Sequence, residues 1–160
     1  MRPEYEREEH RASENEVKAL IEKAHGVKLH KSPRYYHIDY FVTPERSDSV
    51  IGWVEIRGKQ FARHSFPTFY TSIEKFISVG RMAHMTGKPA YIVAKWTDEA
   101  GVYKVEWKDA RRFKIRLGGR TSNSRGDAQD IEPVIHIPTT EFWSINKMSF
   151  QDEQEGTSIV

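Results

Sequence analysis

The chain has 160 residues, of which 38% are hydrophobic and 12% aromatic, so it is long enough to bury the core of one domain. Its formal net charge of +2 does not by itself indicate a nucleic-acid-binding protein, and the absence of cysteine excludes disulfides and thiolate zinc sites. No apolar run approaches the roughly 20 residues that cross a bilayer, and the charged N-terminus lacks the apolar stretch of a secretory signal. We therefore expect one domain over residues 1–150 in the cytoplasm, no membrane partner, and an acidic flexible tail at residues 151–160.

A helix is predicted from Ser13 to Gly26. Ser13 and Glu16 have the spacing of a capping box, in which each residue satisfies a backbone N–H at the helix start. Apolar residues then recur at helical spacing, at Val17, Leu20, Ile21 and Ala24. Gly26 is a typical residue to end such a helix.

Two facing strands are predicted next. Residues 34–43 alternate in strand fashion, and residues 50–57 are the expected partner across a polar turn at 44–49. Residues that face each other across such a hairpin have a constant sum of residue numbers, here about 93. The numbers of Asp39 and Glu55 add up to 94. The two carboxylates are therefore expected to lie opposite each other or nearly so.

The second half of the chain predicts one more helix and four more strands. A loop at 58–70 precedes a second capping box, Thr71 to Glu74, whose helix ends at Gly87. The strands are expected at residues 90–96, 102–108, 113–117 and 133–137, the first two forming one hairpin and the last two another. The composition of residues 118–130 indicates a long flexible loop between the last two strands. This order of elements indicates an α/β domain.

Asp39 and Glu55 are the candidate metal ligands. Hard divalent cations take oxygen ligands, and a metal-dependent nuclease needs carboxylates that converge beside the phosphate. Glu55 and Arg57 are two apart on a strand and so point the same way, which sets an acid for the metal beside a cation for the phosphate. On spacing alone, solvated edge charges are an equally good explanation, because a chain so rich in charge contains this spacing at four places.

The order of these features resembles the PD-(D/E)XK, or restriction-endonuclease-like, nucleases, which include archaeal Holliday-junction resolvases and many phage enzymes. The resemblance covers most of the chain. It is carried by a helix with an acid at Glu16, the strands YHIDYFV and GWVEIRGKQ, the helix opening FPTFYTSIEKF and the strand AYIVAKW. It implies a single α/β domain with an αβββαβ core, in which helices flank a central mixed sheet, and the last hairpin is a C-terminal extension.

The resemblance also implies a metal-dependent nuclease that hydrolyses DNA phosphodiester bonds. Its Mg²⁺, or alternatively Mn²⁺, would be bound by Asp39 and Glu55, with the carbonyl of Ile56 as a further ligand and Glu16 joining through water. A second interpretation of Glu16, which we favour, is that it serves only its capping box. A phage or prokaryotic source and a homodimer are further expectations.

One departure from the family pattern concerns the lysine, whose place is taken by Arg57. Arginine stabilises charge on phosphate but stays protonated, so it cannot take a proton from water. Lys59 and Lys75 are alternative catalytic cations, although Lys75 is equally well explained as a solvated helix lysine. The alternative function is therefore a catalytically inactive nuclease-fold protein that binds DNA or has a structural role.

Basic residues are concentrated from Lys108 to Arg125, a stretch that contains the predicted strand 113–117 and only one acid, Asp109. A basic hairpin suits a phosphate backbone, whereas charges on an edge strand also serve simply to keep it soluble. The candidate DNA contacts are Arg111, Arg112, Lys114, Arg116, Arg120 and Arg125.

Overall fold

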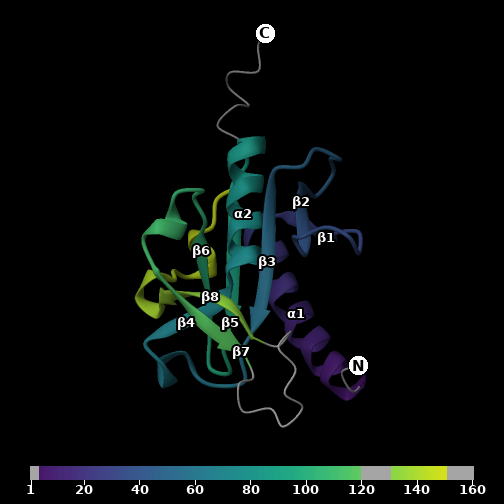
Figure 1. The fold of residues 1–160 in the computed structure, drawn as a ribbon. Helices are drawn as coiled ribbons and strands as arrows, with labels where there is room; N and C mark the ends of the chain where they lie inside the picture. Colours follow the sequence, from purple (N-terminus) through teal and green to yellow (C-terminus); the bar gives the residue numbers. More distant parts are fainter. Residues whose placement is uncertain (1–3, 120–130, 151–160) are drawn as a thin grey trace.

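The computed structural model describes residues 4–119 and 131–150, with two α-helices and eight strands in these ranges (Figure 1). The helices are α1 (Glu4–His25) and α2 (Ile73–Thr86). The strands are β1 (Val27–Lys31), β2 (Tyr40–Pro44), β3 (Gly52–Gly58), β4 (Thr68–Ser72), β5 (Ala90–Lys95), β6 (Ala100–Lys104), β7 (Lys114–Gly119) and β8 (Ile131–Pro138).

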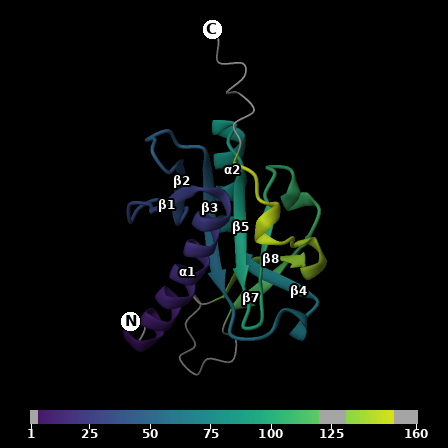
Figure 2. The same cartoon turned by 180° about the vertical axis from the view of Figure 1, so that it is seen from behind.

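The central layer is a five-stranded mixed sheet in the order β1-β2-β3-β5-β6. The pair β3 and β5 is parallel, and the other neighbours are antiparallel. Helix α1 covers one face of this sheet and α2 the other, as the two opposite views show (Figures 1 and 2). The crossover from β3 to the parallel β5 runs through β4 and α2, which places the start of α2 beside the end of β3.

Alternation along β3 decides which side chains face each helix. Val54 and Ile56 are buried in the apolar cluster that contains Val17 and Ile21 of α1. Glu55 lies between them and therefore points to the opposite face, where α2 packs. A strand buried on both faces thus carries one carboxylate on its α2 side.

The predicted hairpin of β7 and β8 is confirmed, but it is not an isolated extension. β8 also pairs with β4, so the three strands form a second antiparallel sheet in the order β4-β8-β7. β4 continues directly into α2. The second sheet is therefore joined to the helix that borders Glu55.

The start of the first helix differs from the prediction, whereas its end agrees. α1 begins at Glu4, so Ser13 lies inside the helix and the first capping box is wrong. The added residues include glutamate, arginine and alanine, which have high helix propensity. Gly26 has a φ of +62°, and its N–H bonds to the carbonyl of Glu22, which confirms it as the helix end.

Several strand predictions need correction. The strand expected at 102–108 is β6, which begins at Ala100 and ends at Lys104. Strand β1 was not expected, and the strand expected at residues 34–43 begins only at Tyr40. The loop expected at 58–70 contains most of β4, which runs to Ser72, so Thr71 is a strand residue and no capping box opens α2. The reason is tertiary: Phe69 and Thr71 are buried by pairing with β8, which is distant in sequence.

The fold class is confirmed as a mixed α/β domain with helices on both faces of a central sheet, and β1 supplies the strand that completes the expected αβββαβ order. In the described part of the chain, neither helix is long and apolar enough to cross a membrane. The expected tail at 151–160 and residues 120–130 of the expected loop lie outside the described residues.

Candidate active site

Asp39 and Glu55 meet where the β2 and β3 pairing stops. Tyr40 and Val54 are the last paired residues of β2 and β3, and Asp39 and Glu55 are the next two residues in the same register. The backbone N–H of Asp39 donates a hydrogen bond to Oε1 of Glu55 at 3.1 Å. The opposition of the two carboxylates that the residue numbers predict is therefore present in the fold.

Glu55 is a buried carboxylate with incomplete compensation. Its side chain is 1% exposed, and Oε2 accepts no hydrogen bond. Nη2 of Arg57 lies 2.6 Å from Oε2, a close ion pair that is not aligned as a hydrogen bond. Burial raises the pKa of Glu55 to about 7, against the lowering effect of Arg57, and the nearby Asp39 raises it further. A buried acceptor without a hydrogen bond calls for an explanation, and a bound ion or water molecule is one.

Asp39 is more accessible and is bordered by Lys31. Its side chain is 20% exposed, and Oδ1 lies 3.9 Å from Nζ of Lys31 at the end of β1. The same Nζ lies 3.6 Å from Oε2 of Glu14 on α1. Lys31 therefore links the carboxylates of Asp39 and Glu14 across the mouth of the site.

Glu14, rather than Glu16, is the acid that α1 directs toward the site. Glu14 also accepts a hydrogen bond from the hydroxyl of Tyr40 at 3.0 Å, whereas Glu16 is exposed. The sequence holds a signal for this difference, because Glu14 precedes the buried Val17 and Ile21 by three and seven residues and so shares their helix face.

The three candidate catalytic cations have different surroundings. Lys59 is half-buried; it donates to the carbonyl of Tyr70 at 3.0 Å and lies 3.9 Å from the centre of the Tyr70 ring. Burial, and then Arg57, lower the pKa of Lys59 to about 8. Lys75, in the first turn of α2, donates to the carbonyl of His37 at 3.4 Å, and its charge lowers the pKa of Glu55. Lys75 is thus electrostatically coupled to the carboxylate, together with Arg57.

Alternation along β3 places the backbone carbonyl of Ile56 on the β2 side of the strand. The N–H groups of Trp53 and Lys59 bond to residues at the two ends of the β5 pairing, so odd-numbered residues of β3 direct their backbone toward β5. Ile56, in the alternate position, directs its carbonyl toward the side where β2 has already ended. That backbone oxygen lies on the Asp39 side of the strand.

These oxygens fit a hard divalent cation better than zinc. In the described ranges no group of three His, Cys, Asp or Glu side chains is arranged to hold a metal ion. Two carboxylates and one backbone carbonyl, with Glu55 Oε2 lacking a hydrogen-bond donor, are the oxygen donor set that Mg²⁺ and Mn²⁺ accept together with water.

The basic residues predicted to contact DNA fall into three groups. Lys114 and Arg116 are exposed on β7, and Arg111 is exposed just before it. Arg112 is held by Glu141 at 2.9 Å and by Asp109 at 3.8 Å, which gives it a structural role. Arg120 and Arg125 lie outside the described residues.

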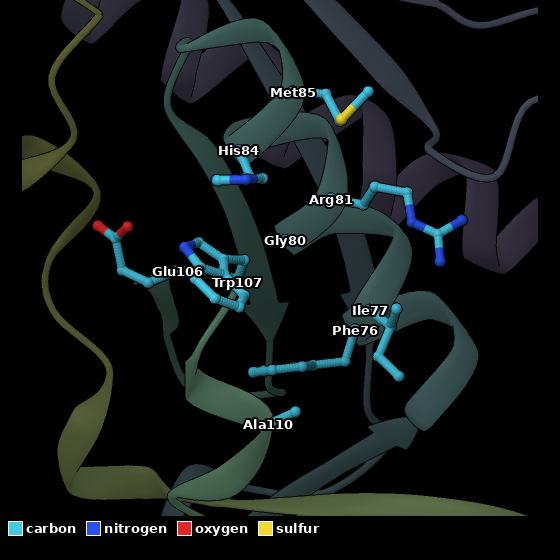
Figure 3. A pocket seen from close by; sticks show the side chains of 9 residues that line it. All are labelled: Phe76, Ile77, Gly80, Arg81, His84, Met85, Glu106, Trp107 and Ala110. Atoms are coloured by element: carbon cyan, nitrogen blue, oxygen red, sulfur yellow. The ribbon is translucent and has the colours of Figure 1, made fainter.

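An apolar pocket lies elsewhere, between α2 and the residues that follow β6 (Figure 3). Phe76, Gly80 and Trp107 line it, and neither Asp39 nor Glu55 does. A nuclease site needs charge and access to phosphate, so this pocket is not a candidate for the chemistry.

Comparison with known proteins supports the nuclease fold. Residues 1–145 match a protein family described as "Phage putative PDDEXK endonuclease". Among solved structures, the Holliday junction resolvase Hjc of the archaeal hyperthermophile Archaeoglobus fulgidus is similar, with a TM-score of 0.52 and 13% sequence identity over 83% of this chain and 96% of that one. No curated protein matches the sequence.

Replacing Glu55 by glutamine should change how stability depends on pH. The pKa of Glu55 is raised from 4.5 to about 7 in the folded protein, so between these values the unfolded chain has lost a proton that the folded chain keeps. Stability from this group therefore falls as the pH rises through that window. In Glu55→Gln the fall is absent, so from below pH 4.5 to above pH 7 the unfolding free energy should shift in favour of the variant by a few kcal/mol.

Urea denaturation over this pH range measures the difference. Glu16→Gln, which removes an exposed carboxylate from α1, is the matched control and should follow the wild type. Parallel curves for the wild type and Glu55→Gln would contradict the raised pKa.

Proposed function

Because this chain belongs to the family of phage PDDEXK endonucleases, which it matches over residues 1–145, we propose that it hydrolyses DNA phosphodiester bonds with a divalent metal ion at Asp39 and Glu55. The observation that carries the proposal is the meeting of these two side chains beyond the last β2 and β3 pair, with Glu55 buried and its Oε2 lacking a hydrogen bond. Mg²⁺ is the proposed ion, with Mn²⁺ as a substitute.

The proposed ligands are the carboxylates of Asp39 and Glu55 and the carbonyl of Ile56. When bound, a divalent cation polarises the phosphate and lowers the pKa of a water molecule, which is the chemistry that phosphodiester hydrolysis needs. Glu14 takes the water-mediated role that the resemblance implies for Glu16, since Lys31 bridges Glu14 and the partly exposed Asp39.

The three cations have different proposed roles. Arg57 compensates the buried charge of Glu55 in the free protein, and its guanidinium suits a phosphate once Glu55 has another partner. Lys75 provides charge close to Glu55 and is the proposed stabiliser of the negative charge that develops on the phosphate. Lys59 is held under the Tyr70 ring and is assigned to the DNA-binding surface rather than to the chemistry.

The proposed DNA-binding surface is the outer face of the second sheet. Tyr70, His136 and Lys114 form one row across β4, β8 and β7, and Arg116 follows two residues after Lys114. Burial, and then the charges of Arg116 and Lys59, lower the pKa of His136, so the cations lie close enough to act on one another. This basic surface begins at Lys59, just beyond β3, so it starts near the candidate active site and extends outward from it.

The runner-up is a DNA-binding protein without cleavage activity. It is favoured by one observation: Arg57 replaces the expected lysine and already forms an ion pair with Oε2 of Glu55. Such a protein would keep the basic surface of the second sheet and bind DNA equally well with or without metal.

Branched DNA is the first substrate class to test, because the similar Archaeoglobus structure is that of a Holliday junction resolvase. A four-way junction has pseudo-twofold symmetry, so paired cuts suit a homodimer, which we also propose. An intracellular location follows from the proposed DNA substrate.

Removing either carboxylate should weaken metal binding and lower the cleavage rate together. We expect the wild type to bind Mn²⁺ in isothermal titration calorimetry and to cut branched DNA, and Asp39→Asn or Glu55→Gln to bind it at least about tenfold more weakly. Glu16→Gln is the control and should bind like the wild type. A wild type that binds DNA but neither binds metal nor cuts would establish the runner-up instead.

Lys75→Ala should lower the cleavage rate by roughly 10²- to 10³-fold, because it removes a charge next to the reacting phosphate. Its Mn²⁺ affinity should stay close to that of the wild type, and Lys75→Arg should restore most of the rate. Arg81→Ala removes an exposed cation further along α2 and serves as the control. Equal rates for Lys75→Ala and Arg81→Ala would exclude Lys75 from the chemistry.

Lys114→Ala combined with Arg116→Ala should weaken DNA binding and its salt dependence. Each lost phosphate contact lowers the slope of log K against log salt by about 0.9, so we expect a decrease of roughly two. Fluorescence anisotropy in EDTA measures binding without cleavage. Lys28→Ala with Arg46→Ala removes the same charge at the opposite end of the β2 pairing and should leave the slope unchanged; an equal decrease in both variants would contradict this surface.

A further inference from the structure

Two tyrosines stand exposed in the loop that leads into Asp39. Tyr35 is 80% exposed and Tyr36 is 44% exposed, and their ring centres lie 5.4 Å apart. We call residues 33–38 the tyrosine loop. Aromatic side chains of this size usually bury much of their surface, so two neighbouring exposed rings are available for a partner.

The tyrosine loop is anchored at both ends. The N–H of Ser32 donates to the carbonyl of Asp39 at 2.7 Å, which closes the base of the loop, and the N–H of Tyr36 donates to the carbonyl of Pro33 at 2.9 Å. Ile38 is 3% exposed in the apolar cluster under α2. The two rings are therefore presented by a fixed segment, which reduces the entropy that a bound partner has to overcome.

The anchoring also fixes the loop at the candidate active site. The carbonyl of His37 accepts a hydrogen bond from Lys75, and its ring lies 3.6 Å from Glu74, so the loop is held by the first turn of α2. Asp39 is the third residue after Tyr36, which limits the distance between their Cα atoms to about 11 Å. A nucleotide stacked on these rings would be a near neighbour of a phosphate at Asp39.

The charge around the loop favours a nucleic acid as the partner. Arg34 is exposed within the loop, and Lys31, just before the loop, has a side chain that is 61% exposed. Lys75 contacts the loop through the carbonyl of His37. Aromatic rings bordered by cations suit a base and its phosphate, and stacking on rings tolerates any base. Bases inside a duplex are already stacked on their neighbours, so only unpaired bases are free to stack on the rings.

We propose that Tyr35 and Tyr36 stack on unpaired nucleotides beside the scissile phosphate and so direct the protein to DNA with branches, flaps or single-stranded segments. The inference rests on the proposed function, which it deepens by naming the substrate class. Tyr35 and Tyr36 act here as specificity-determining residues, and Asp39 and Glu55 remain the catalytic pair.

The test compares Tyr35→Ala with Tyr36→Ala as a double variant against the double change to phenylalanine, which keeps both rings. Trp143→Ala is a control for the loss of an exposed aromatic residue, because Trp143 is 62% exposed and pairs with β6 at the opposite edge of the central sheet. Binding to a single strand, a flapped duplex and a blunt duplex is followed by anisotropy in EDTA, with 2-aminopurine in the flap to report stacking. Thermal unfolding checks that each variant is folded.

The alanine variant should bind single-stranded and flapped DNA about 5- to 150-fold more weakly, should lose the quenching of 2-aminopurine, and should bind blunt duplex within about twofold of the wild type. The phenylalanine variant and Trp143→Ala should behave like the wild type. The binding assays contain EDTA and no metal, so they do not depend on cleavage. This pattern therefore supports the inference even if the wild type does not cut DNA.

Other outcomes would overturn it. If the alanine variant loses affinity for the blunt duplex and the flapped DNA equally, or for neither, the tyrosines do not read unpaired bases. If it instead changes the oligomeric state in sedimentation while its flap affinity is retained, the tyrosine loop is a contact between copies of the chain. If the alanine variant gives either of these results but the wild type still cuts DNA with metal, the tyrosine inference fails and the proposed function stands. Cleavage by the wild type therefore distinguishes failure of the inference from failure of the proposed function.

Discussion

The burial of Glu55 in the central strand is the constraint on which the candidate site depends. An ionised carboxylate at 1% exposure carries a desolvation cost of several kcal/mol unless partners replace the lost water. The described neighbours do this only in part: the Asp39 N–H bonds to one oxygen, and Arg57 pairs with the other without hydrogen-bond alignment. These surroundings raise the pKa of Glu55 to about 7, and the partial compensation of its charge is the feature from which the proposed metal site is argued.

Unequal strand length creates the opening at which this carboxylate becomes useful. β2 leaves the sheet at Tyr40, while β3 continues to Gly58 with β5 as its neighbour on one side. At this end of the pairing Asp39 is partly exposed, whereas Glu55 is buried. The β4 and α2 crossover then returns to the same place and brings Lys75, so that two acids and two cations from distant parts of the chain converge.

The sequence predicts those parts of the site that follow strand geometry. Asp39 and Glu55 were found because pairing in a hairpin conserves the sum of residue numbers, which holds even though the strand expected at 34–43 begins only at Tyr40. Glu16 entered the candidate site only through the family resemblance, and its favoured role in a capping box fails because α1 begins at Glu4 and turns Glu14 inward instead. Strand β1 has only Val27 and Leu29 as buried residues, too weak a pattern to recognise, and β4 depends on pairing with β8, which local sequence does not encode.

The pairing of β4 with β8 also has a consequence for the order of folding. Tyr70 lies opposite His136, so this contact closes a loop of more than sixty residues, whereas β1, β2 and β3 pair within thirty-two residues of one another. Closing a long loop loses more chain entropy and is slow, so the central sheet is expected to form before the second sheet docks. β2 and β3 precede α2 in the chain, so Asp39 and Glu55 can meet before the lysine in the first turn of α2 is in place. During synthesis, the emerging chain would hold its paired acids well before it could assemble a complete active centre.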